Sequence, residues 1–169
     1  MNNIIIEAFK GDQRAMDEIA IKHLKIRRWQ EATGQNKFRD IYDSQNDLKN
    51  IYSYYINGGG MFLVARDIVT NEVVGFVALK NEGDGYGVGK RLAVLPEYQK
   101  QGIATRLLDE LKQWALENNF IRFTLSTNTG EKALTLYKKL GCESYGFDDE
   151  NQDYLMKLEW ESNNMEESA

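Results

Sequence analysis

The sequence predicts a single domain of mixed α/β class, and three observations support this prediction. The chain has 169 residues, a suitable length for one ordinary domain. It contains a single proline, Pro96, and no change of composition that would mark a linker. The apolar pattern changes from helical spacing near the N-terminus to strand-like runs after residue 60. We therefore expect one domain over residues 1–160 and an acidic, polar tail at 161–169 that frays.

The N-terminal part is expected to form a short strand followed by helices. Ile4–Ile6 are β-branched and suit a strand. Apolar residues recur at helical spacing from Gln13 to Gln30 and again from Asp47 to Ile56. Asn57–Gly60 then ends the second helix, because glycine adopts backbone angles that other residues resist. The segment 31–44 has an ambiguous pattern.

Strands and helices are expected to alternate in the second half. Met61–Ala65 and Val73–Leu79 are apolar runs separated by a turn at Thr70–Glu72, which predicts a hairpin. The elements predicted next are a strand over Tyr86–Val94, an apolar helix from Ile103, a strand over Phe120–Ser126, a helix over Glu131–Leu140, and strands over Cys142–Phe147 and Tyr154–Trp160. This order is typical of an α/β domain in which helices flank a mixed sheet.

Charge and composition argue against several classes of function. The formal net charge of −5 argues against a general nucleic-acid binder. The longest apolar stretches are far below the roughly 18 residues that span a bilayer, and the N-terminus has no signal-peptide pattern. The single cysteine, Cys142, forms no internal disulfide, and the single histidine, His23, excludes a His-rich metal site. We expect a cytoplasmic protein without nucleic-acid or membrane partners, with His23 on a helix surface.

The stretch Leu92–Leu108 reads as a strand, a loop and the start of a helix, where an anion can bind. The first N–H groups of a helix have no internal partner, and the helix dipole adds positive potential there. Gly102 lacks a Cβ atom, Ala104 is small, and Lys100 and Gln101 carry no negative charge. These features fit a diphosphate cradle, although many strand–loop–helix joints contain a glycine and bind nothing.

Other phosphate-binding motifs fit poorly. Gly89-Lys90 resembles the end of a P-loop, but Asp84 stands where the first glycine is required and Arg91 where Ser or Thr is required. The alternating glycines at 83, 85, 87 and 89 do not form a G-x-G-x-x-G frame. We interpret them as a turn and a kinked strand.

Two short motifs occur in order, separated by one predicted helix and one predicted strand. The first is Gln99-x-x-Gly102-x-Ala104, and the second is Ala133-Leu-Thr-Leu-Tyr-Lys-Lys-Leu-Gly-Cys142. They resemble the R/Q-x-x-G-x-G/A and A-x-x-L-Y-x-K-L-G-F motifs of the GNAT superfamily of N-acetyltransferases. The resemblance covers Met61–Trp160 well and the N-terminal helices only loosely. It implies the GNAT fold, a mixed, mostly antiparallel twisted sheet flanked by helices, with acetyl-CoA as co-substrate and no metal.

The resemblance also implies roles for the matched positions. Main-chain groups of Leu92, Ala93 and Val94 would pair with the pantetheine arm of the cofactor. The pyrophosphate would be held by the main-chain N–H groups of Lys100, Gln101, Gly102, Ile103, Ala104 and Thr105. A backbone N–H near Val94 or Leu95, at a β-bulge, would stabilise the oxyanion.

Tyr137 falls where the family places its general acid. A phenol, with an ordinary pKa near 10, is a usable proton donor to a departing thiolate. Without the motif, Tyr137 reads as an aromatic on the packed face of a short helix.

The chain departs from the family pattern in three places. The usual cofactor-contacting asparagine is replaced by Gly130, so either Asn128 substitutes for it or the contact is missing. The usual aromatic after Leu-Gly is Cys142, which we expect to be a small core residue. The strand before the first motif lacks the usual glutamate base. Glu82, Asp84 or a water relay are the alternatives, while Glu97 is expected to be structural.

The resemblance implies direct transfer of an acetyl group from acetyl-CoA to a primary amine of a small molecule, through a ternary complex and without an acetyl-enzyme. The alternatives are a protein lysine or N-terminal acetyltransferase, and a non-catalytic acyl-CoA-binding module. Acceptor specificity is expected in the N-terminal helices and at 57–60. Aromatic residues there form either an acceptor pocket or part of the core: Trp29, Phe38, Tyr42, Tyr52, Tyr54 and Tyr55. Acidic residues there either recruit a cationic amine or lie in a solvated loop: Asp40, Asp43 and Asp47. The length and the exposed edge of the hairpin are compatible with a homodimer.

Overall fold

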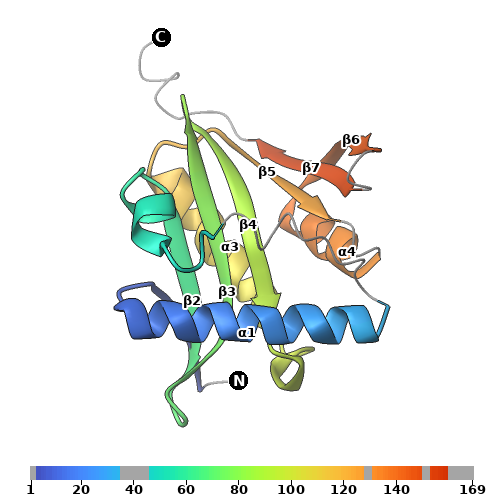
Figure 1. Ribbon diagram of the computed structural model, residues 1–169. Helices are drawn as coiled ribbons and strands as arrows, with labels where there is room; N and C mark the ends of the chain where they lie inside the picture. Colours follow the sequence, from blue (N-terminus) through green and yellow to red (C-terminus); the bar gives the residue numbers. More distant parts are fainter. Residues whose placement is uncertain (1–2, 35–45, 128–130, 150–152, 160–169) are drawn as a thin grey trace.

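A seven-stranded sheet organises the part of the chain that the structure describes, residues 3–34, 46–127, 131–149 and 153–159 of a computed structural model (Figure 1). The strand order is β1-β2-β3-β4-β5-β7-β6. The strands are β1 (Ile4–Ala8), β2 (Met61–Asp67), β3 (Glu72–Gly83), β4 (Tyr86–Val94), β5 (Arg122–Thr127), β6 (Glu143–Asp148) and β7 (Asp153–Glu159). Neighbouring strands pair antiparallel except β4 and β5, which are parallel. The predicted fold class, a mixed and mostly antiparallel sheet with helices, is confirmed.

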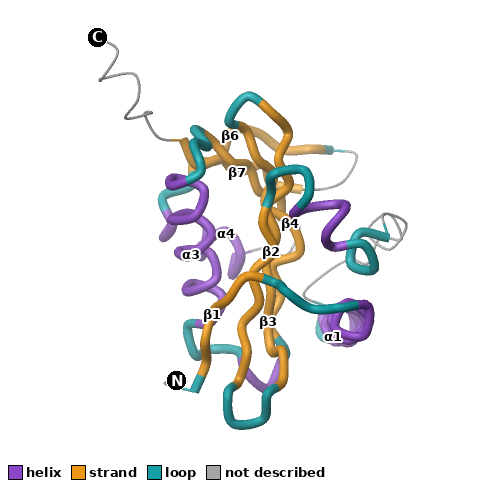
Figure 2. Tube along the Cα trace, turned by 90° about the vertical axis from the view of Figure 1, so that its left-hand side faces the viewer, coloured by secondary structure: helices purple, strands orange, loops and turns teal. Residues whose placement is uncertain are grey.

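Helices cover both faces of the sheet. Figure 2 shows α1 (Gln13–Ala32) on one side and α3 (Ile103–Glu117) with α4 (Glu131–Leu140) on the other. The apolar face of α3 contributes Leu107, Leu108 and Leu111 to the core, each at most 1% exposed. On the α1 side the core is aromatic, with Phe62 stacked on Phe76 at 6.0 Å between ring centroids. The sheet therefore has two different packed faces.

The N-terminal helix follows its prediction, whereas the second helical segment is shorter than predicted. Helix α1 begins after Asp12, whose side chain accepts a hydrogen bond from the Ala15 N–H at 3.2 Å, as an N-cap does. The predicted helix over Asp47–Ile56 forms only a short π-helix, η1 (Tyr52–Ile56). The physical reason is that the Asp47 side chain turns inward, 1% exposed, so the chain before η1 follows that buried carboxylate.

The predicted hairpin is present, but its edge is covered. β2 and β3 pair from Met61↔Leu79 to Asp67↔Glu72. β1 adds to the outer side of β2, and β4 adds to the outer side of β3. The expected exposed hairpin edge was therefore wrong, because the N-terminal strand supplies the missing hydrogen-bond partner.

Candidate functional site

The strands β4 and β5 start side by side and then separate. They pair only at Tyr86↔Arg122, Gly87↔Phe123 and Val88↔Thr124. β4 continues to Val94 and stays paired with β3 as far as Val94↔Gly75. Within the described residues, the edge of β4 from Gly89 to Val94 therefore has no strand on the β5 side. An extended ligand with amide groups can pair with such an edge as a strand would.

A β-bulge lies in this open part of β4. Ala78 pairs with Lys90 and Phe76 with Ala93, so β4 has one more residue than β3 over this interval. Arg91, inside the bulge, has a φ of 63°, in the left-handed region. The bulge lies at Arg91 and Leu92, earlier than the expected position near Val94.

The Leu95 N–H is engaged within the sheet. It donates to the Val74 carbonyl oxygen at 2.8 Å, so it points toward β3. Successive backbone groups of a strand alternate in direction, so the Val94 N–H points away from β3, toward the open edge. Of the two expected oxyanion donors, Val94 alone has the required direction.

The loop after β4 leads directly to the N-terminus of α3. A 3-10 turn, η2 (Pro96–Tyr98), follows the strand, and the Gln99 amide Nε2 then donates to the Val94 carbonyl at 3.0 Å. Lys100 and Gly102 both have left-handed backbones, with φ of 63° and 79°. Together these features turn the chain back so that α3 starts beside the end of β4.

Open space lies in front of this helix N-terminus. Gly102 occupies the N-cap position without a side-chain cap, and a Cβ atom built on it would meet nothing within 4 Å. The first helical hydrogen bond runs from the Arg106 N–H to the Gly102 carbonyl at 3.1 Å, so the N–H groups before Arg106 precede the internal ladder. The residues predicted as the cradle, Lys100 to Thr105, thus surround an uncapped, positively polarised helix end.

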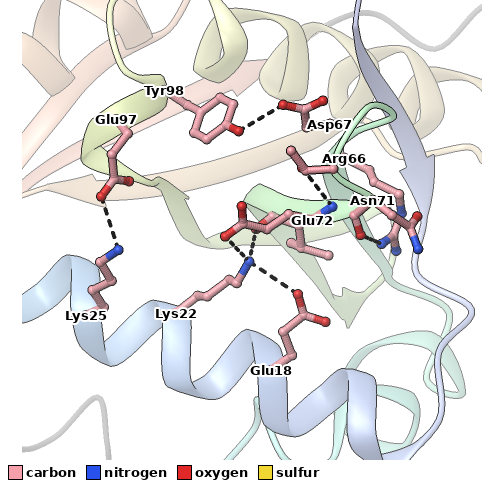
Figure 3. Close-up of polar contacts among 11 residues, drawn as sticks. Glu18, Lys22, Lys25, Arg66, Asp67, Asn71, Glu72, Glu97 and Tyr98 are labelled. Atoms are coloured by element: carbon pink, nitrogen blue, oxygen red, sulfur yellow. Dashed lines mark hydrogen bonds and ion pairs between the residues drawn. The ribbon is translucent and has the colours of Figure 1, made fainter.

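Polar contacts fix the turn before the cradle to the rest of the domain (Figure 3). The Tyr98 hydroxyl donates to Asp67 Oδ2 at 2.8 Å, which lowers the pKa of that carboxyl. Glu97 pairs with Lys25 of α1 at 3.1 Å. Near it, Lys22 of α1 pairs with Glu72 of β3 at 2.7 Å. The contact of Glu97 with α1 is compatible with the interpretation of Glu97 as a structural residue, which stays a prediction.

Tyr137 and Cys142 flank the end of α4, and both side chains are buried at 5% exposure. The Cys142 N–H donates to the Tyr137 carbonyl, and the Gly141 N–H to the Lys138 carbonyl, which form a Schellman motif. Gly141, with a φ of 105°, supplies the left-handed residue that this motif needs. Burial raises the pKa of Cys142 to about 11, which confirms it as a core thiol. Asn128 and Gly130 lie outside the described residues.

The two carboxylates considered as general bases lie at the far end of β4. Glu82 and Asp84 are exposed in and beside the β3–β4 turn. From Tyr86 to the bulge at Arg91 the strand advances by roughly 17 Å, at about 3.3 Å per residue. Glu82 also lies 3.7 Å from Lys80. Neither carboxylate can reach an amine held near the bulge.

A buried polar cluster lies on the α1 face, beneath the bulge, and two predictions fail there. His23 is 6% exposed and its ring is 6.1 Å from that of Phe76, so it is not a surface residue. Burial, reinforced by Arg91 and Arg27, lowers the pKa of His23 to about 3. Asp47 lies neither in a solvated loop nor in a position to recruit an amine, because Arg91 Nη2 and Nε donate to its oxygens at 2.6 and 3.0 Å.

The aromatic residues proposed for the acceptor pocket have different environments. Tyr55 is fully buried, donates to Asp47 and belongs to the core. Tyr52 packs on Phe9 at 5.4 Å between centroids. Tyr54 is partly exposed and accepts a hydrogen bond from Lys90 Nζ at 3.3 Å. Trp29 is half-buried on α1, while Phe38, Asp40, Tyr42 and Asp43 lie outside the described residues.

Sequence reasoning missed the pairing of Asp47 with Arg91. The two residues are 44 positions apart, and neither stands in a motif. The described residues contain no group of three or more His, Cys, Asp or Glu side chains that could hold a metal ion. None of the helices in the described ranges is both long and apolar enough to span a bilayer.

Comparisons with known proteins agree with this geometry. N-acetyltransferase 8F1 of Rattus norvegicus is 32% identical over 108 residues, which are 60% of this chain and 48% of that protein. Streptothricin acetyltransferase A of Bacillus subtilis is 33% identical over 57 residues, which are 34% of this chain and 33% of that protein. The chain thus spans about half or less of the length of these relatives.

The fold and a family model agree on one assignment. The crystal structure of a GNAT-family acetyltransferase from Staphylococcus aureus Mu50 superposes with a TM-score of 0.78 at 23% identity, covering 94% of this chain and 99% of that one. The model of the acetyltransferase (GNAT) family matches residues 21–142, which include the open edge of β4, the α3 N-terminus and the end of α4. The chain therefore belongs to the GNAT family of acetyltransferases.

Proposed function

We propose that this protein is an acetyl-CoA-dependent N-acetyltransferase that acetylates a primary amine of a small molecule through a ternary complex. One observation carries the proposal. The open edge of β4 runs onto an uncapped helix N-terminus at Gly102, where a Cβ atom would meet nothing within 4 Å. An extended arm of amides fits such an edge, and a diphosphate fits such a helix end.

The cofactor would be held mostly by main-chain groups. Of the three residues expected to pair with the pantetheine arm, Leu92 and Val94 would do so along the open edge, while the main-chain groups of Ala93 face β3. The N–H groups from Lys100 through Gln101, Gly102, Ile103 and Ala104 to Thr105 would donate to the pyrophosphate. The side chain of Asn128 would take the place of the family's usual cofactor-contacting asparagine. Because the contacts are mainly backbone, loop shape matters more here than side-chain identity.

The transfer itself needs few side chains. The lone pair of the deprotonated amine attacks the thioester carbonyl carbon, and the Val94 N–H donates to the oxyanion that forms. The carbon–sulfur bond then breaks, and Tyr137 gives its hydroxyl proton to the departing thiolate. The proton lost by the amine goes to water, and water returns a proton to Tyr137. Cys142, protonated and buried, forms no acetyl-enzyme.

The proposal of a small-molecule acceptor is supported by the name of one relative. The Bacillus subtilis relative is a streptothricin acetyltransferase. Turnover with small primary amines, measured by thiol release from acetyl-CoA, is the expected result. Acetylation restricted to peptide lysines or N-termini would favour a protein acetyltransferase. Binding without turnover on either class would favour a non-catalytic module.

The first test is a calorimetric titration with acetyl-CoA. We expect stoichiometric binding to the wild-type protein, and its loss in Gly102→Glu, because the new carboxylate enters the anion cradle and repels the phosphates. Gly83→Glu is a matched control. Gly83 also has a positive φ, 93°, and open space at its Cβ position, but it lies at the opposite end of β4. Any strain from the positive φ is common to both variants, so only the location differs.

Two results would contradict the proposal. The wild-type protein could fail to bind acetyl-CoA at millimolar concentration. Alternatively, Gly102→Glu and Gly83→Glu could weaken binding equally, which would show that the effect comes from backbone strain and not from the cradle.

A further inference from the structure

The bulge in β4 is connected by a buried ion pair to Asp47, which precedes η1 in the chain. The side chains of Arg91 and Asp47 are 4% and 1% exposed. Arg91 Nη2 and Nε donate to the two carboxylate oxygens of Asp47 at 2.6 and 3.0 Å, a two-pronged geometry that fixes the guanidinium plane. Arg91 thus ties the open part of β4 to Asp47, on the α1 face of the sheet.

The Asp47 carboxylate is itself held by its surroundings. The Tyr55 hydroxyl, from η1, donates to Oδ2 of the same carboxylate. Arg91 Nη1 also lies 3.4 Å from His23 Nε2 of α1. Three elements therefore meet at one buried salt bridge, which lowers the pKa of Asp47 and keeps it charged. Such a pair adds little net stability but strongly favours one geometry, because either charge left alone in the interior is costly.

The backbone at Arg91 needs such an anchor. A non-glycine residue in the left-handed region is strained, and it persists where the surroundings over-determine it. Relaxation of Arg91 would remove the extra residue from the bulge and shift the register of β4 beyond it by one position. A shift by one position would exchange the direction of the N–H groups at Val94 and Leu95. The open edge would then present the wrong groups to a ligand.

From these contacts we infer that Asp47 and Arg91 are positioning residues that hold the β4 bulge, and with it the direction of the Val94 N–H. Neither residue touches the reacting atoms; they act through the strand. The inference rests on the proposed function for the part that concerns acetyl-CoA, while its structural part concerns the bulge alone. It also implies that Asp47, which lies outside the sheet, influences cofactor binding at the open edge of β4.

The test compares Asp47→Asn with Ile4→Ala. Asp47→Asn keeps the shape of the side chain but removes the charge and one of the two acceptors of Arg91. Ile4→Ala also costs stability, because it removes buried apolar atoms, but Ile4 lies in β1, which β2 and β3 separate from β4. Two quantities are measured under conditions in which both variants are fully folded: amide exchange at residues 89–94 and the Kd for acetyl-CoA by calorimetry.

For Asp47→Asn we expect faster amide exchange in 89–94 and a Kd raised about tenfold or more, since the loss of one or two hydrogen bonds to the cofactor changes the Kd by about that factor. For Ile4→Ala we expect wild-type exchange in that segment and a Kd within about twofold of wild type. Arg91→Lys, which keeps the charge but loses the second donor, is expected to resemble Asp47→Asn. It also replaces Asp47→Asn if that variant does not fold.

Wild-type exchange and a wild-type Kd in folded Asp47→Asn or Arg91→Lys would overturn the inference. Equal effects in Ile4→Ala and Asp47→Asn would also overturn it, because loss of stability would then explain both. If the wild-type protein itself fails to bind acetyl-CoA, the proposed function is wrong. The exchange of residues 89–94 then decides this inference alone.

Discussion

At the scale of single residues, Tyr137 and Cys142 show how environment separates two groups capable of proton or acyl chemistry. Both side chains are 5% exposed and both adjoin the end of α4. The thiol, with its pKa raised to about 11, is protonated at neutral pH and is a poor nucleophile. A phenol, by contrast, acts as an acid only in its protonated form, which is its ordinary form at neutral pH. Direct transfer with Tyr137 as the acid therefore fits this pair better than a covalent route through Cys142.

Replacing Tyr137 by phenylalanine tests that assignment. The ring and its packing stay, and only the hydroxyl is lost. We expect kcat to fall about a hundredfold or more, since general acid catalysis contributes on the order of 10²–10⁴. The Kd for acetyl-CoA should stay within about twofold of the wild-type value. Cys142→Ala is the control and should keep its kcat. Equal kcat for wild type and Tyr137→Phe would remove the tyrosine from the mechanism.

At the scale of elements, α4 is placed by the way it ends. The Schellman motif at its C-terminus ends the helix three residues after Tyr137 and turns the chain into β6. The left-handed residue of that motif is Gly141, whose Cβ position lies 3.3 Å from Leu158 Cδ1 of β7. The glycine of the Leu140-Gly141 pair in the second sequence motif is therefore required by backbone geometry. It lies close in the chain to Tyr137, the residue proposed to act as the acid.

Gly141→Ala is expected to lower the free energy of unfolding by about 1–2 kcal/mol, because alanine is strained at this φ and crowds Leu158. Gly146→Ala in β6 is the control. Its Cβ position lies 3.6 Å from Leu155, an ordinary contact, and its φ is not positive. Urea denaturation of the three proteins gives the comparison. If both variants lose the same stability, strain at Gly141 is not what fixes the end of α4.

Elements with a strong local pattern were predicted closely. β4 over Tyr86–Val94 and α4 over Glu131–Leu140 have the predicted bounds, because alternation and helical spacing are properties of neighbouring residues. The segment Asp47–Ile56 has the same apolar spacing, yet its first four residues are not helical and Tyr52–Ile56 form a π-helix. There a tertiary contact, the burial of the Asp47 carboxylate against Arg91, decides the backbone, and no local pattern records it.

At the scale of the whole molecule, the candidate site combines one part that is local in sequence with one that is not. The cradle from Lys100 to Thr105 is one continuous segment, a loop and the first residues of α3, and its glycine and helix start were visible in the sequence. The direction of the backbone groups along the open edge of β4 depends on a bulge whose Arg91 contacts Asp47 and His23, residues far away in the chain. His23 illustrates the difference. Its neighbours in the chain are basic and suggest a surface, but the sheet and Arg91 bury it.

The burial of His23 predicts how the stability of the whole domain depends on pH. Its pKa is about 3 in the folded protein and near 6.5 in the unfolded chain, so between these values the unfolded chain binds a proton that the folded protein excludes. Stability therefore falls as pH drops below about 6.5. The expected loss is about 2 kcal/mol between pH 6.5 and 5, at roughly 1.4 kcal/mol per unit. Asp47 is an acid and not a base, but its effect on stability has the same direction with pH. Its pKa is also lowered in the folded protein, so the stability that it contributes is lost only below about pH 4.

Because His23 and Asp47 affect stability in different ranges of pH, His23→Gln isolates the contribution of the histidine. Glutamine does not titrate, so the variant should keep a nearly constant free energy of unfolding between pH 6.5 and 5. The free energy of unfolding of the wild type should fall over the same interval by the contribution of His23. Urea denaturation at half-unit steps of pH measures both curves. Parallel curves would show that His23 takes up its proton in the folded protein. The cluster beneath the bulge would then open far more readily than its buried contacts imply, and Asp47 and Arg91 could not hold β4 rigidly.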